Sequence, residues 1–340
     1  GHDRLNLLLS PMRFGGITIQ PQPGETVQDP AAGTAGFLIA ADRYIKDHTN
    51  DLYDLNEKQI RFQRNQAFLG MELVAGTRRL ALMNCLLHGM EGDAEGVVHV
   101  GNTLGSAGSG LPKSHIILSN PPFGTAKGGG GPTRDDLTFA TSNKQLAFVQ
   151  HIVRHLRDGG RAAVVLPDNV LFEGGVGADI RRDLMDKCRL HTILRLPTGI
   201  FYAQGVKTNV LFFEKVSQAA TGSTQEVWVY DMRANAPKFG KRTPLTDAHF
   251  ADFIAAYGDE PNGKATRQDQ GEQGRFRRFC REWIASEKGD SLDIAWLKDD
   301  SAEDAADLPE PAVLAREAMD ELNGAMAELE AILAELGAVV

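Results

Sequence analysis

A short turn near residue 120 carries the side chains best suited to chemistry, in the sequence Asn120-Pro121-Pro122-Phe123. Two consecutive prolines fix φ and remove two backbone donors, so the turn is rigid and rich in hydrogen-bond acceptors. Asn120 Oδ1 and the Pro121 carbonyl can accept both protons of a planar exocyclic amine, which favours a pyramidal nitrogen with an available lone pair. Phe123 offers a face for stacking a base swung out of a duplex. We therefore predict that all four residues are catalytic; the competing interpretation is a proline-stiffened turn with a core phenylalanine.

The loop from Asp29 to Phe37 is the predicted cofactor site. Gly33 and Gly36 allow a tight turn and close backbone approach at the place where doubly wound sheets bind nucleotides. Glu72, at the end of the second predicted strand, suits hydrogen bonds to two ribose hydroxyls. The loop alone does not distinguish NAD from S-adenosylmethionine, but the turn at 120–123 favours direct attack on a sulfonium methyl group. The loop residues predicted to bind the cofactor are Asp29, Ala31, Gly33, Thr34, Gly36 and Phe37.

The elements that must position these residues follow a regular pattern between about residues 24 and 215. Short β-branched runs alternate with helical patterns, which predicts an α/β fold with a doubly wound, mostly parallel, seven-stranded sheet. The predicted strands are 26–28, 67–72, 97–100, 115–118, 161–166, 192–196 and 208–213, and the helices 37–47, 74–88, 145–156 and 180–188. Gly159-Gly160 is expected to end the third of these helices as a C-cap. Glycine-rich stretches at 101–110 and 124–131 are expected to be loops flanking the turn.

The pattern changes after residue 217, which suggests a division of the chain. We expect a poorly matched N-terminal segment (1–22), a catalytic domain (23–217), a C-terminal extension (218–310) with one more strand at 226–230, and an amphipathic helix (311–340). Apolar residues of the last segment alternate three and four apart and form one seam, at Met319, Leu322, Met326, Leu329, Leu333 and Leu336. This seam packs either on its own domain or on a partner chain.

Composition and charge limit the classes of protein that fit. The chain is 42% hydrophobic and 24% charged, values of an ordinary globular protein. Three scattered cysteines fit neither a zinc site nor a disulfide framework, so we expect the reducing cytoplasm, and the histidines show no metal-like cluster. The N-terminal apolar run is too short to span a bilayer. A net charge of −9 predicts that the chain grips DNA with help, since proteins that bind phosphates alone present basic surface.

The motifs, taken in order, resemble one family: the modification (methyltransferase) subunits of type I restriction-modification systems, among the amino-group DNA methyltransferases. The markers are residues 29–37, Glu72 with 79–84, 120–123, 159–167 and 207–213, with a continuation at 229–233. The resemblance implies a Rossmann-like domain that transfers a methyl group from S-adenosylmethionine to the exocyclic N6 of a flipped adenine. It also implies that Asn102 and Thr103 bind the cofactor, with Asn102 standing where an acidic residue usually faces the cofactor's adenine ring.

The resemblance further implies partners. A separate specificity subunit selects the DNA sequence, two modification subunits bind one specificity subunit, and a restriction subunit can join. The seam of residues 319–336 is the candidate contact with the specificity subunit. The family normally begins with a long helical domain that helps clasp DNA, and it carries an aromatic-Thr-Pro segment before the cofactor loop. The helical domain is not evident in this sequence, so we expect a truncated chain. Residues 7–20 do not match the aromatic-Thr-Pro segment, so we also expect weakened cofactor binding.

Minor signals and alternatives remain open at this point. Lys127 and Arg134 either contact phosphates of a flipped nucleotide or are solvated loop charges. Residues 275–281 interleave basic and aromatic side chains, which favours a surface helix with buried aromatics over a nucleic-acid contact. Asp168 is expected to be a cap or turn former. The alternative functions are a protein glutamine N5-methyltransferase and an inactive truncated scaffold, and cofactor binding separates the scaffold from both enzymes.

Overall fold

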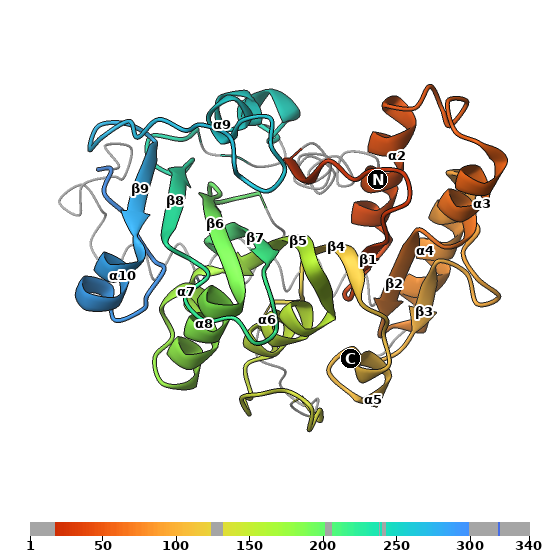
Figure 1. Ribbon diagram of the computed structural model, residues 1–340, viewed down its shortest axis with the longest axis horizontal. Coiled ribbons are helices and arrows are strands. Elements are labelled where there is room, and N and C mark those ends of the chain that lie inside the picture. The colour runs from red at the N-terminus through yellow and green to blue at the C-terminus, as the bar shows by residue number, and fades with distance from the viewer. Residues whose placement is uncertain are drawn as a thin grey trace. The chain divides into compact units, whose positions relative to one another are not determined.

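The computed structural model describes residues 18–123, 132–200, 206–237, 239, 243–298 and 319. Within these residues, nine strands form one sheet in the order β3-β2-β1-β4-β5-β7-β6-β8-β9, which runs from right to left in Figure 1. Neighbours are parallel except for three antiparallel pairs, β5 with β7, β6 with β7, and β8 with β9. The strands are β1 (Val27–Asp29), β2 (Phe68–Glu72), β3 (Val98–Val100), β4 (Ser114–Ser119), β5 (Leu156–Pro167), β6 (Cys188–Arg195), β7 (Thr208–Lys215), β8 (Glu226–Asp231) and β9 (Phe276–Cys280).

Helices cover both faces of this sheet, so the predicted doubly wound α/β fold is confirmed. One core layer packs the sheet against α2, α4 and α9, through residues such as Leu38, Ala81 and Phe253. The other packs it against α6, α8 and α10, through Ile152 and Leu184 among others. The helical elements are α2 (Gly36–Asp47), α3 (Glu57–Asn65), α4 (Ala75–Leu87), α5 (Ser106–Ser109), α6 (Lys144–His155), α7 (Asp168–Phe172), α8 (Val176–Lys187), η1 (Asp247–Phe250), α9 (Ala251–Tyr257) and α10 (Arg281–Lys288).

The strand count is the first difference from the sequence prediction. All seven expected strands and the extra one at 226–230 are present, but the sheet continues to a ninth, because residues 276–280 form β9. The prediction of a surface helix at residues 275–281 is wrong, although the aromatic residues there are buried as predicted. Phe276 packs into one core layer and Phe279 into the other, so the edge strand is covered on both faces. Pairing with β9 also satisfies the backbone groups that β8 would otherwise expose at the edge.

The glycine pair at 159–160 does not cap a helix. Helix α6 ends at His155, and β5 begins at the next residue. Gly159 has φ of +78°, and the register of β5 against β4 shifts between Ser114 and Ile116. A Cβ on Gly160 would lie 2.8 Å from the His115 carbonyl oxygen. The pair therefore serves an irregularity in the sheet, where the backbones of β4 and β5 approach closely.

Residues 1–297 form one compact unit and residues 298–340 a second. The boundary expected near residue 218 falls inside the first unit, since β8 and β9 extend the same sheet. Of the predicted C-terminal seam, Met319 alone is described, as an exposed helical residue, and the rest lies outside the described residues. Among the described residues, no helix is both long and apolar enough to cross a membrane, and no group of three or more His, Cys, Asp or Glu side chains could hold a metal ion.

Candidate active site

A cleft of about 480 Å³ opens where β1, β2 and β4 end, which is where doubly wound sheets hold their ligands. Its size is within the range of small-molecule sites. The loop after β1, the end of β2 and the turn after β4 all contribute to its walls. The lining residues are Pro30, Ala31, Gly33, Met71, Glu72, Leu73, Val74, Gly101, Asn102, Thr103, Leu104, Asn120, Pro122, Pro132, Lys144 and Phe148.

The turn at residues 120–123 carries a buried acceptor without a described partner at the wall of this cleft. Asn120 lines the cleft, and its Oδ1 is buried without a hydrogen-bond donor among the described atoms. A buried polar atom without a partner is costly, and such atoms point to a missing ligand or water. The turn is held from behind, because Gln145 Nε2 donates to the Pro122 carbonyl at 2.8 Å. Phe123 is half-buried and packs against a core layer.

The loop after β1 is fixed by three bonds to two neighbouring segments, β2 and the loop after β3. Ala32 N donates to the Met71 carbonyl at 2.9 Å, and Gly33 N donates to Glu72 Oε2 at 3.0 Å. Thr103 Oγ1 donates to the Pro30 carbonyl at 2.5 Å. Gly33 has φ of +54°, a conformation that glycine adopts without penalty. The loop is therefore held in place with its backbone facing the cleft.

Asp29 lies behind the loop and is fully buried. Its Oδ1 accepts from Ala31 N at 3.0 Å and from Ser119 Oγ at 2.9 Å. Burial and, to a smaller extent, the nearby Glu72 carboxylate raise the pKa of Asp29 while the two hydrogen bonds lower it, and together these effects bring the pKa to about 7. Asp29 therefore joins the loop after β1, at Ala31, to the end of β4, at Ser119.

The structure brings most of the predicted site residues together. Seven of them line the cleft: the predicted cofactor-binding residues Ala31, Gly33, Glu72, Asn102 and Thr103, and Asn120 and Pro122 of the turn. The remaining predicted residues are not among those that line the cleft: Phe37 is in the core and the Thr34 carbonyl accepts from Asn84 Nδ2. These residues are Asp29, Thr34, Gly36, Phe37, Pro121 and Phe123.

Sequence reasoning missed several of the cleft's walls. Lys144 and Phe148 come from α6, and Pro132 and Leu104 from loops. The signal available for Lys144 was Asn143, whose side chain caps α6 by accepting from Gln145 N and Leu146 N. Asn102 also has a local role, since its Oδ1 accepts from Leu104 N at 3.0 Å.

Arg134 has a different role from either one predicted. Its side chain is fully buried, with its guanidinium bonded to Asp136 at 2.5 and 2.7 Å and to the Thr103 carbonyl at 3.3 Å. It also contacts His151 Nδ1, and burial keeps the pKa of His151 well below its ordinary value. Arg134 is therefore a structural residue that supports the cleft wall at Thr103, and it does not reach phosphates. Lys127 lies outside the described residues.

Asp168 begins α7 and is an ion-pair residue. Both of its oxygens accept from Arg233, at 2.6 and 2.9 Å, and Asn209 Nδ2 donates to it at 2.8 Å. Although burial opposes ionisation, these bonds and the charges of Arg233 and Arg195 lower the pKa of Asp168. Because Arg233 follows β8, the ion pair ties the end of β5 to the end of β8, and the bond from Asn209 adds the start of β7.

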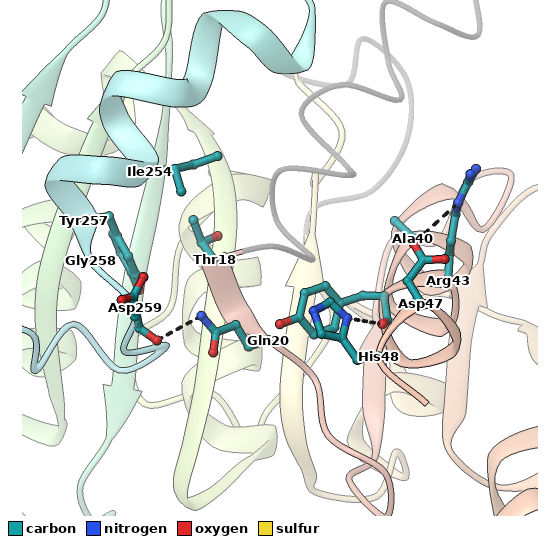
Figure 2. Close-up of a pocket in the computed structure, with 11 residues that line it drawn as sticks. Thr18, Gln20, Ala40, Arg43, Asp47, His48, Ile254, Tyr257, Gly258 and Asp259 are labelled. Atoms are coloured by element: carbon teal, nitrogen blue, oxygen red, sulfur yellow. Dashed lines mark hydrogen bonds and ion pairs between the residues drawn. The ribbon is translucent and has the colours of Figure 1, made fainter. Parts of the chain in front are cut away.

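A second hollow, of about 280 Å³, lies at the far end of α2 from the cleft (Figure 2). Residues 18–20, the end of α2 and residues 254–259 line it. Polar groups there are paired with one another: Gln20 Nε2 donates to the Asp259 carbonyl at 3.0 Å, and Arg43 lies 3.9 Å from Asp47. None of the predicted site residues contributes to its described lining.

The fold and the cleft define a class: doubly wound enzymes that hold a nucleoside-containing cofactor beside an acceptor-rich turn suited to an amino group. Residues 12–283 match the family model described as N-6 DNA Methylase, and the chain belongs to this family. Residues 308–339 match the model described as Type I restriction enzyme methylase subunit, C-terminal domain. The resemblance inferred from the motifs is thereby confirmed.

Two relatives and one solved structure illustrate the similarity. The Type I restriction enzyme EcoKI methylase subunit of Escherichia coli (strain K12) is 58% identical over 352 residues, covering 94% of this chain and 66% of that protein. The EcoEI methylase subunit of Escherichia coli is 35% identical over 261 residues, covering 76% of this chain and 51% of that protein. The crystal structure of the EcoKI M protein has a TM-score of 0.81 and 55% identity, over 97% of this chain and 73% of that chain. The chain thus spans just under two thirds of the length of its EcoKI relative.

Proposed function

We propose that this chain carries the catalytic domain of an adenine-specific DNA methyltransferase that uses S-adenosylmethionine within a type I restriction-modification complex. The observation that carries the proposal is the buried, unpaired Oδ1 of Asn120 at the wall of the cleft. An acceptor in that position lacks a donor, and an exocyclic amino group supplies one. The family and the EcoKI relative support the same reading.

The residues present fit the cofactor. The backbone at Ala31 and Gly33 and the carboxylate of Glu72 would hold its ribose and its amino-acid end, while Asn102 and Thr103 would face its adenine. When bound, S-adenosylmethionine supplies an electrophilic methyl group on a sulfonium. The chain contributes positioning and fixed dipoles, which account for much of the rate in a direct displacement.

The target base is handled by the turn after β4. Asn120 Oδ1 and the Pro121 carbonyl accept the two protons of the adenine amino group, which frees its lone pair for attack. Phe123 stacks on the base once it leaves the duplex. Gln145 keeps the turn in place through the Pro122 carbonyl.

Partners follow from the same proposal. We infer that the seam of residues 319–336 binds a specificity subunit that selects the DNA sequence, and that a second modification subunit and a restriction subunit complete the assembly. The match of residues 308–339 to a methylase C-terminal domain supports this, as does the net charge of −9. DNA as the substrate makes the cytoplasm the expected compartment. A Leu329→Glu variant should lose co-purification with the specificity subunit, whereas Glu328→Gln, off the seam, should retain it.

The decisive experiment is transfer of labelled methyl groups to DNA, with and without the specificity subunit. We expect label only in the complete complex, on adenine N6, and sequencing of the product identifies the target adenine. Asn120→Ala should lower kcat by about 10²–10³, the typical cost of removing one preorganised polar group. Asn120→Asp keeps an acceptor oxygen and should retain part of the activity.

Four outcomes would contradict the proposal. Label on cytosine would exclude the base assigned here, and activity that survives Asn120→Ala would exclude the role of the turn. Label on glutamine of a protein substrate, with none on DNA, would favour a protein methyltransferase. Failure of the wild-type complex to bind S-adenosylhomocysteine would favour an inactive scaffold.

A further inference from the structure

The cofactor loop and the catalytic turn meet at one buried hydrogen bond. β1 and β4 are parallel neighbours, with Gln28 beside Ile117, so the residues that follow these strands emerge side by side. Ser119 Oγ donates to Asp29 Oδ1 at 2.9 Å, and the same oxygen accepts from Ala31 N at 3.0 Å. Ser119 is fully buried and Asp29 is 1% exposed, so water does not compete for these groups.

The two segments are otherwise anchored to different parts of the sheet. The loop is bonded to Met71, Glu72 and Thr103, which belong to the β2 and β3 side. The turn is bonded to Gln145 at the start of α6, on the other side. One carboxylate oxygen of Asp29 therefore links Ala31, which lines the cleft, to Ser119, the residue immediately before Asn120.

We propose that Ser119 is a positioning residue that couples occupancy of the cofactor loop to the placement of Asn120. The proposal rests on the proposed function, since it assigns a role to Ser119 in that same site. A ligand that contacts Ala31 and Gly33 fixes the Ala31 N–H, and with it the Asp29 carboxylate. That carboxylate fixes Ser119, so Asn120 Oδ1 is held ready for the target amine when the cofactor is present.

Coupling of this kind is reciprocal, which makes it measurable by binding alone. In the complex with the specificity subunit, S-adenosylhomocysteine should tighten binding of a duplex that carries the unmethylated target adenine, and the duplex should tighten binding of S-adenosylhomocysteine by the same factor. For the wild-type chain we expect a factor between about 5 and 150, the usual range for coupled sites.

Two variants and a matched control test the role of Ser119. Ser119→Ala removes the hydroxyl, and Ser119→Cys keeps most of the volume with a weak donor. Both variants should lower the coupling factor and kcat by about tenfold, because a tenfold change is roughly what one hydrogen bond to a charged group is worth. The Kd for S-adenosylhomocysteine alone should change less than about threefold. Ser114→Ala, at the opposite end of β4 and also buried, should leave the coupling unchanged.

The pH profile supplies a readout that a purely structural role would not move. The Ser119 hydrogen bond lowers the pKa of Asp29, while burial and the facing Glu72 carboxylate raise it. Loss of this hydrogen bond in Ser119→Ala should therefore raise the pKa of Asp29 and shift the acidic limb of the kcat profile to higher pH. Ser114→Ala should leave the profile unchanged.

The outcomes separate this proposal from the one before it. If the wild-type complex methylates DNA but Ser119→Ala keeps the coupling factor and the pH profile, the role of Ser119 is refuted and the function stands. Equal loss of affinity for S-adenosylhomocysteine with and without DNA would also refute it, as a structural effect. If the wild-type complex methylates nothing, the proposed function itself fails.

Discussion

Asp29→Asn should make this protein more stable at neutral and alkaline pH, although it lies beside the active site. The Asp29 carboxyl is fully buried, with Glu72 as a facing negative charge, and the hydrogen bonds from Ala31 and Ser119 do not offset the cost of burial. Asparagine keeps the acceptor oxygen for both donors and removes the charge. The expected gain is therefore the cost of holding a carboxylate in this place.

The pKa of Asp29 gives the size and the sign of this effect. It rises from an ordinary value of 3.8 to about 7 in the folded protein. Between these two values the unfolded chain binds fewer protons than the folded one, so stability falls as pH rises. Each pH unit corresponds to about 1.4 kcal/mol, which makes about 4 kcal/mol the upper bound for the loss. The variant avoids this loss, so its advantage should grow from about pH 4 to pH 7 and level off above it.

Urea unfolding of the wild-type protein and of Asp29→Asn between pH 4 and 8.5 measures the difference in their free energies of unfolding. The contributions of the other titrating groups cancel in this difference. A matched control is Asp42→Asn, because Asp42 is also buried but lies 2.6 Å from Lys46 and accepts from Gln63. Breaking that pair should destabilise the protein. A stability gain for Asp29→Asn that is the same at pH 4.5 and pH 8, or a loss at pH 8, would refute the reasoning.

Two further changes test the walls of the cleft. Gly108→Ala would place a Cβ 1.8 Å from the Thr103 carbonyl oxygen, so the loop at Thr103 must move. Calorimetry should then show at least about tenfold weaker S-adenosylhomocysteine binding, a loss of roughly 1.4 kcal/mol. Unchanged affinity would show that Thr103 does not hold the cofactor. Arg134→Met leaves Asp136 and the Thr103 carbonyl without their buried partner. The free energy of unfolding in urea should fall by about 2–3 kcal/mol, which is less than for a wholly buried pair because Arg154 also pairs with Asp136. Arg154→Met, at an exposed pair, should lower it by under about 1 kcal/mol.

The parts of the site that lie on one continuous stretch of sequence were predictable. Asn120 follows an apolar run and precedes two prolines, and Glu72 ends a strand, so both carry their position in local pattern. The cleft residues on α6 were not predictable in the same way. Lys144 and Phe148 reach the cleft because α6 packs beside the turn, a contact that no local periodicity encodes.

Two errors have related causes. Residues 276–280 alternate poorly between buried and exposed, because one phenylalanine enters each core layer; that spacing of three resembles a helical face. Arg134 is predicted either to contact phosphates or to be a solvated loop charge, because its partners are not evident from the chain. Asp136 is close in sequence, but His151 and Thr103 approach it only in the fold. Tertiary burial, and not local propensity, decides both places.

The hydrogen bond between Asp29 and Ser119 also has a consequence for how the protein is made. It joins residues 90 positions apart, and a ribosome needs roughly 5–20 s to synthesise that length. During this interval β1 has emerged without β4, its neighbour in the sheet. A ligand stabilises only a state that binds it, so cofactor cannot protect the nascent chain before residue 119 is available. The growing polypeptide must therefore stay soluble with β1 unpaired on one side.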